Sequence, residues 1–107
     1  MNFDFDEARI RVGESTDSWG PYVFSFRGAL PDPAGDPISN VIVKSFLGAT
    51  ETTGDLIDGA PQIVSPAVRL KFKYPGESRK GKHVLRFTVT LAGGGENGFE
   101  FGYVEVE

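Results

Sequence analysis

Two stretches of this chain alternate strictly between apolar and polar residues, and this period of two restricts the fold more than any other feature. They are "AVRLKFKY" (67–74) and "HVLRFTVTL" (83–91). Successive side chains of a β-strand point to opposite faces, so alternation predicts strands with one buried and one wet face. The residues expected in the core are Leu70, Phe72, Leu85, Phe87 and Val89.

Two further segments extend this pattern. "YVFSFRG" (22–28) alternates in the same way, with aromatic residues on one parity. "ISNVIVKSFLG" (38–48) is apolar on both parities, which predicts a central strand covered on both sides. No stretch reads as a long amphipathic helix.

The two ends of the chain each change parity partway. Near the C-terminus the aromatic pair Phe99 and Phe101 gives way to Val104 and Val106, and Gly102 between them predicts a β-bulge. Near the N-terminus a similar change across "DEA" (6–8) predicts a strand that breaks and crosses from one sheet to another, as strands of sandwiches do.

Composition agrees with short strands separated by turns. The 107 residues include 14 glycines, 7 prolines and 9 phenylalanines. We therefore predict a single all-β domain spanning residues 1–107, an immunoglobulin-like β-sandwich of six to eight antiparallel strands, with a small β-barrel as the alternative.

Charge and cysteine content exclude several classes of function. The net charge of -4 argues against nucleic-acid binding, which needs a dense Lys/Arg surface. The absence of cysteine excludes disulfides and thiolate zinc sites. The acidic N-terminus does not read as a signal peptide, and no apolar run reaches membrane-helix length, so we expect a soluble protein that stays in the producing cell, with no membrane partner.

The tract "GGGENG" (93–98) formally satisfies G-x-G-x-x-G. A dinucleotide loop needs a helix after it, whereas an alternating strand flanks this tract on each side. We predict a β-hairpin with Asn97-Gly98 as its turn pair, and no bound nucleotide or other cofactor. Asp58-Gly59 predicts a second, smaller hairpin within residues 55–66.

Cations cluster between residues 69 and 86 in this acidic chain. If the two strongest strands are neighbours, their outward cations form one positive ribbon that could dock an acidic protein partner. Solvated turn charges are the simpler reading. The ribbon would comprise Arg69, Lys71, Lys73 and Arg86, extended in the turn by Arg79, Lys80 and Lys82.

The remaining candidate residues give little support for catalysis. His83, the only histidine, shares the inward parity of its strand, so we expect a packed, hydrogen-bonded histidine, and no nucleophile motif accompanies it. Trp19 beside Gly20-Pro21 is expected to pack or, with Tyr22, to form a recognition platform. The loop acids Asp32, Asp36, Asp55 and Asp58 could bind calcium, but they lack D-x-D-x-D-G spacing.

The segment "KYPGESRKGKHVLRFTVTLAGGG" (73–95) with "FEFGYVEV" (99–106) resembles the closing strands of bacterial immunoglobulin-like and PKD-like domains. In those domains a G-x-Y/H-x-L-x-F/V-x-V-T strand leads through a glycine turn into V-x-V. More loosely, residues 22–106 are similar to small β-sandwich proteins encoded among phage and prophage structural genes. The chain departs from the family pattern at His83, where tyrosine is typical. Bacterial adhesion modules also normally occur in secreted multidomain chains, whereas this chain is short and lacks a signal.

The resemblance implies a non-enzymatic module for assembly, decoration or adhesion. We therefore expect a structural or protein-interaction module, including a prophage-derived virion assembly or decoration protein. Its partner would be an acidic protein or further copies of itself, and its location the cytoplasm or, for a phage protein, the virion. The alternative is a carbohydrate- or calcium-binding β-sandwich module. Fold alone does not choose between them.

Overall fold

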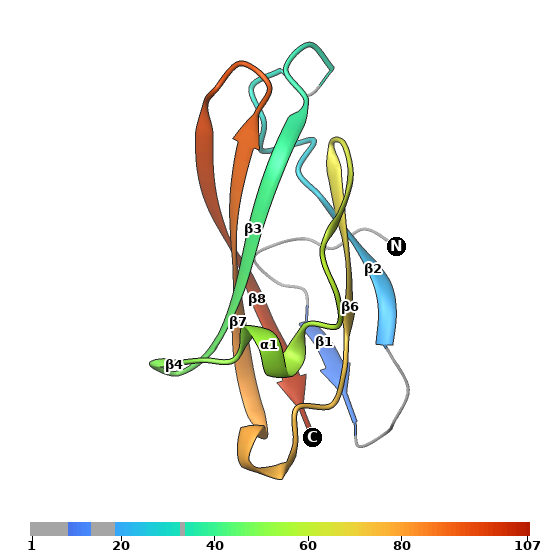
Figure 1. Ribbon diagram of the computed structural model, residues 1–107, viewed down its shortest axis with the longest axis vertical. Coiled ribbons are helices and arrows are strands. Elements are labelled where there is room, and N and C mark those ends of the chain that lie inside the picture. The colour runs from blue at the N-terminus through green and yellow to red at the C-terminus, as the bar shows by residue number, and fades with distance from the viewer. Residues whose placement is uncertain (1–8, 14–18, 33) are drawn as a thin grey trace.

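Two β-sheets pack face to face in the computed structural model, which describes residues 9–13, 19–32 and 34–107 (Figure 1). One four-residue helix, α1 (Thr53–Leu56), lies at one end of the sandwich, and a 3-10 turn, η1 (Glu77–Arg79), joins the sheets there. The strands in the described residues are β1 (Arg9–Val12), β2 (Trp19–Ser25), β3 (Ile38–Leu47), β4 (Thr50–Glu51), β5 (Gln62–Val64), β6 (Ala67–Phe72), β7 (Gly81–Leu91) and β8 (Glu96–Val106).

The strand order is that of an immunoglobulin-like sandwich. One sheet has the order β1-β8-β7-β3-β4 and the other β2-β6-β5. Immunoglobulin domains place strands G, F, C and C′ in one sheet and B, E and D in the other, and β8, β7, β3, β4 and β2, β6, β5 follow the same order. Neighbouring strands are antiparallel, except that β1 runs parallel to β8. The predicted all-β sandwich is confirmed, and the two separate sheets rule out the barrel alternative.

The core lies between the sheets and contains all five residues that alternation placed there, each at most 2% exposed. Aromatic rings join the two layers: Phe87 on β7 meets Phe24 at 5.1 Å and Phe26 at 5.4 Å between ring centroids. Antibody domains link their B and F strands at this level with a disulfide. This cysteine-free chain links the corresponding strands, β2 and β7, by aromatic packing.

The predicted hairpin and bulge both occur. β7 and β8 pair in antiparallel register, and residues 92–95 connect them. The turn pair, however, is not Asn97-Gly98, which lies inside β8; Gly94, with φ of 95°, supplies the left-handed backbone earlier in the tract, so the turn closes there. The bulge is visible in the register, because His83 pairs with Val104 while Leu85 pairs with Phe101, leaving one extra residue on β8.

Two other expectations are wrong. β3 pairs with β7 along its length but with β4 only at Phe46 and Leu47, so it is not central, and the described residues cover only one of its faces, since Ile42 is 51% exposed. The second hairpin is absent: Leu56 and Ile57 are buried, so this segment anchors in the core and Asp58-Gly59 only leads the chain toward β5. The predicted strand crossing at residues 6–8 lies outside the described residues.

Candidate functional site

The seven cations of the predicted ribbon do not share one face. β6, which carries Arg69 and Lys71, belongs to the three-stranded sheet, whereas β7, which carries Arg86, belongs to the five-stranded sheet. Residues 73–80 cross between the sheets instead of turning back within one (Figure 1). The premise that the two strands are neighbours is therefore wrong, and the ribbon divides between two sheets and the turn that joins them.

The cations of the turn and of β7 have acidic neighbours. Arg79 lies 3.4 Å from Asp55, and Lys80 lies 3.6 Å from Glu77. Arg86 contacts Glu100 at 2.8 Å, and its guanidinium also lies 4.6 Å above the Phe46 ring. Lys82 stands opposite Glu105 in the register of β7 and β8. These four cations are thus matched by acids within the protein.

Three cations remain, and we call Arg69, Lys71 and Lys73 the basic strip. Among the described residues, none of the three forms an ion pair within 4.0 Å. Arg69 and Lys71 occupy alternate positions of β6, so their side chains emerge about 7 Å apart on the outer face of the three-stranded sheet, and Lys73 follows directly after the end of β6. Arg69 is half-buried between Gln62 of β5 and Val23 of β2, whereas the two lysines are exposed.

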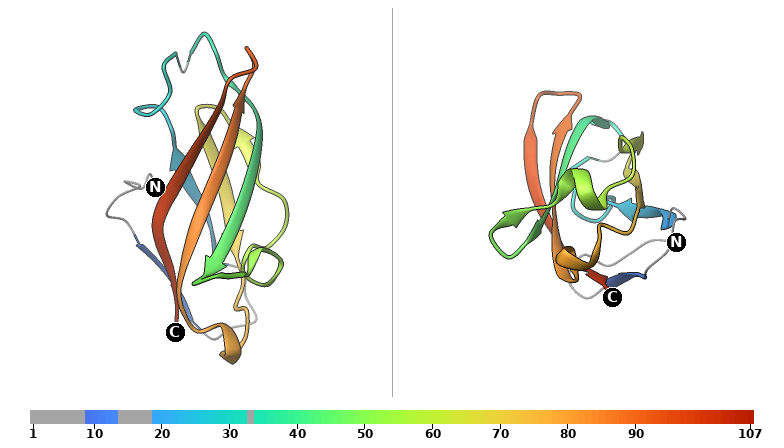
Figure 2. Two further views of the ribbon diagram at one scale, coloured as in Figure 1. Left: turned by 90° about the vertical axis from the view of Figure 1, so that its left-hand side faces the viewer. Right: turned by 60° about the horizontal axis from the view of Figure 1, so that its bottom comes forward.

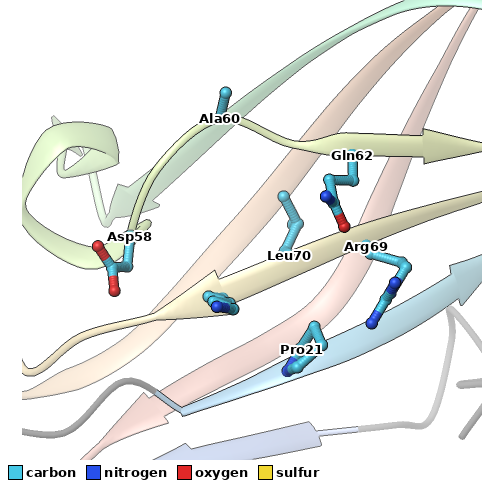
Figure 3. A pocket seen from close by; sticks show the side chains of 7 residues that line it. Pro21, Asp58, Ala60, Gln62, Arg69 and Leu70 are labelled. Atoms are coloured by element: carbon cyan, nitrogen blue, oxygen red, sulfur yellow. The ribbon is translucent and has the colours of Figure 1, made fainter.

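A hollow of about 380 Å³ adjoins the basic strip (Figure 3). It forms because β6 lacks regular neighbours there: β2 is irregular between Trp19 and Tyr22, and β5 begins only at Gln62. Small side chains, Pro21 and Ala60, leave the space open, and Arg69 and Gln62 lie on one side of it with Asp58 on the other. Two cations of the basic strip, Arg69 and Lys71, thus line the hollow together with one acid, Asp58.

This arrangement suits the recognition of carboxylates. A guanidinium presents a planar fork of donors that matches a carboxylate bidentately, and ammonium groups add point charges. The Gln62 amide, which lies beside Arg69 in Figure 3, offers further N–H donors at the same surface. The basic strip is therefore a candidate docking site for acidic side chains.

The predicted aromatic platform does not form from Tyr22. Its ring is half-buried and packs against the core, with its centroid 5.8 Å from that of Phe72. Trp19 begins β2 and pairs with Phe72, but its side chain lies outside the described residues. Tyr22 thus belongs to the packing of the sandwich.

His83 is fully buried, as its inward parity predicted, and it has two partners. Its Nε2 lies 2.6 Å from the carbonyl oxygen of Arg79, which can only accept, so Nε2–H donates. Its Nδ1 lies 2.8 Å from the Thr52 hydroxyl, and Thr52 Oγ1 in turn is 2.8 Å from Ser45 Oγ. Sequence reasoning missed the hydroxyls of Thr52 and Ser45, since no local pattern joins His83 to positions 31 and 38 residues away.

One hydrogen bond of this relay has a counterpart in immunoglobulin domains. In immunoglobulin domains a tyrosine near the start of strand F bonds to the backbone a few residues upstream. His83, the third residue of β7, makes the corresponding bond to Arg79. The Ser45, Thr52 and His83 side chains are at most 1% exposed, so the relay braces the fold and is out of reach of a substrate.

The loop aspartates do not gather into a metal site. Asp32 and Asp36 accept backbone N–H bonds from Gly35 and Gly93, and Asp55 contacts Arg79. Within the described residues no three His, Cys, Asp or Glu side chains converge. The calcium alternative therefore gains no support from their arrangement.

Comparison with known proteins adds no assignment. No protein-family model matches this chain, and no curated protein is significantly similar to it. Neither described helix has the length or apolar run needed to cross a bilayer.

Proposed function

We propose that this protein is a non-enzymatic interaction module that docks an acidic protein partner on its basic strip. The observation that carries the proposal is the basic strip itself: three regularly spaced cations without ion-pair partners among the described residues, on a protein of net charge -4. The other cations of the predicted ribbon lie beside acids of the same chain. Within that ribbon, an added carboxylate is therefore attracted most strongly to the basic strip.

The spacing of the basic strip favours an extended partner segment. Acidic residues at every second position of a β-strand also emerge about 7 Å apart on one face, so they match the strip step for step. Arg69 has the geometry for a bidentate contact, and the two exposed lysines can adjust to the partner. A role in assembly or decoration, which the resemblance implies, would use such a surface. Nothing in the described residues favours the carbohydrate or calcium alternative.

The test measures binding of a fluorescent peptide with alternating Glu and Thr, against a Gln and Thr peptide. Lys71→Gln with Lys73→Gln should weaken binding of the Glu peptide by about tenfold or more, and the affinity of the unmodified protein should fall as salt rises. The matched control, Arg27→Gln with Lys80→Gln, removes the same charge at exposed sites elsewhere and should change affinity by less than about twofold.

If both double variants lost the same affinity for the Glu peptide, binding would depend on net charge alone, which would refute the proposal. Binding of the Glu and Gln peptides with the same affinity would also refute the proposal.

A further inference from the structure

The outer face of the five-stranded sheet is left uncovered by the described residues. This face, formed by β3, β7 and β8, is turned toward the viewer in the left view of Figure 2. Ile42 at its centre is 51% exposed, and Phe46 and Val84 beside it are half-buried. β3 is thus apolar on both parities, like a strand with two buried faces, while the described residues bury only one of its faces.

The register aligns side chains of this outer face in rows that run across the three strands. Each row contains one residue from β8, one from β7 and one from β3. The three rows are Glu96, Thr90 and Asn40; Gly98, Thr88 and Ile42; and Glu100, Arg86 and Lys44.

In each row the residue on β8 complements the residue on β3. Gly98 leaves a gap, since a Cβ there would meet nothing closer than 4.0 Å, while Ile42 projects from the other end of the same row. In the next row Glu100 carries the opposite charge to Lys44. In the third, the Glu96 carboxylate matches the Asn40 amide, which can donate to it.

We propose that a second copy of this chain covers the outer face, related to the first by a two-fold axis that lies between the faces and parallel to β7. This rotation places β8 of one copy over β3 of the other, row on row, as an isologous contact requires. Ile42 then fills the gap above Gly98 of the second copy, and Lys44 meets Glu100 of the second copy.

The charges of the outer face allow two acidic molecules to meet there. Its rows hold two acids, Glu96 and Glu100, and two cations, Lys44 and Arg86, so the face is neutral on a protein of net charge -4. Arg86 lies at the axis, but it is held to Glu100 and over the Phe46 ring of its own chain. Repulsion between copies is therefore small at this face.

The size of the outer face predicts a weak dimer. Strands of about ten residues measure roughly 34 Å, and three strands span about 14 Å, so each copy offers about 500 Å². The total of about 1,000 Å² is at the low end for specific interfaces, which fits a micromolar dissociation constant.

Sedimentation velocity over about 5 to 500 µM tests the dimer, since this range brackets a micromolar dissociation constant. In the proposed dimer, Lys44→Glu places a glutamate opposite Glu100 of the second copy. Glu100→Lys places a lysine opposite Lys44 of the second copy. Each single variant should weaken dimerisation by about tenfold or more. Mixed one to one, the two variants should form a heterodimer, because each acid then faces a cation.

Both variants keep a net negative charge, so attraction between their overall charges cannot produce a heterodimer. A heterodimer in the mixture would therefore show pairing through this face. The matched control is Lys71→Glu on the opposite sheet, which makes the same charge change and should leave the dimer intact. Circular dichroism confirms that each variant is folded. A monomeric natural protein at about 500 µM, single variants that dimerise normally, or a mixture that stays monomeric would each overturn the proposal. The dimer does not depend on the basic strip.

Discussion

Replacing Phe87 with alanine should remove the main aromatic link between the two sheets. The ring is 1% exposed and packs against Phe24 and Phe26 on the opposite sheet. Lost burial contributes about 2 kcal/mol, and two aromatic pairs contribute about 1 kcal/mol each. The expected loss in the free energy of unfolding is about 4 kcal/mol, within the usual range for buried Phe→Ala changes and a large share of the stability of a small domain.

Urea unfolding followed by far-UV circular dichroism measures this loss. With a slope of about 2 kcal/mol per molar urea, the midpoint should fall by about 2 M. Phe87→Leu keeps most of the apolar volume but loses the ring pairs, and should cost about 1.5 kcal/mol. Val64→Ala, at a site 55% exposed, should change stability by about 0.5 kcal/mol or less. A loss below about 1.5 kcal/mol for Phe87→Ala would refute the role assigned to the ring.

Two further predictions concern the buried relay and the hairpin turn. His83→Ala leaves buried polar groups without partners and should lower the free energy of unfolding by about 2–4 kcal/mol. Ser45→Ala, at the end of the relay, should lower it by only about 1 kcal/mol. Equal losses for the two variants in urea titrations would contradict the relay. Gly94→Ala should lower the free energy of unfolding by about 1 kcal/mol or more because φ is positive there, while Gly95→Ala should change it little. A larger fall in melting temperature for Gly95→Ala than for Gly94→Ala would show that the turn is misplaced.

Features that depend on a few consecutive residues could be predicted from the sequence. The alternation around Leu70 and Leu85 identified which side of each strand is buried, because side chains of a strand take opposite faces in turn. The bulge near Gly102 followed from a parity change within one strand. The inward position of His83 followed in the same way.

Features that depend on pairing between distant segments were decided only by the tertiary structure. β6 and β7 have the same alternating pattern, yet they belong to different sheets, so the predicted cationic ribbon divides. Of its seven cations, only the three of the basic strip lack an ion-pair partner among the described residues. Thr52, which bonds His83, and Ser45, which bonds Thr52, lie 31 and 38 residues away from His83 in the sequence. Alternation determines which face of a strand is wet, but it carries no information about which strand lies beside it, because that choice depends on contacts between segments far apart in the chain.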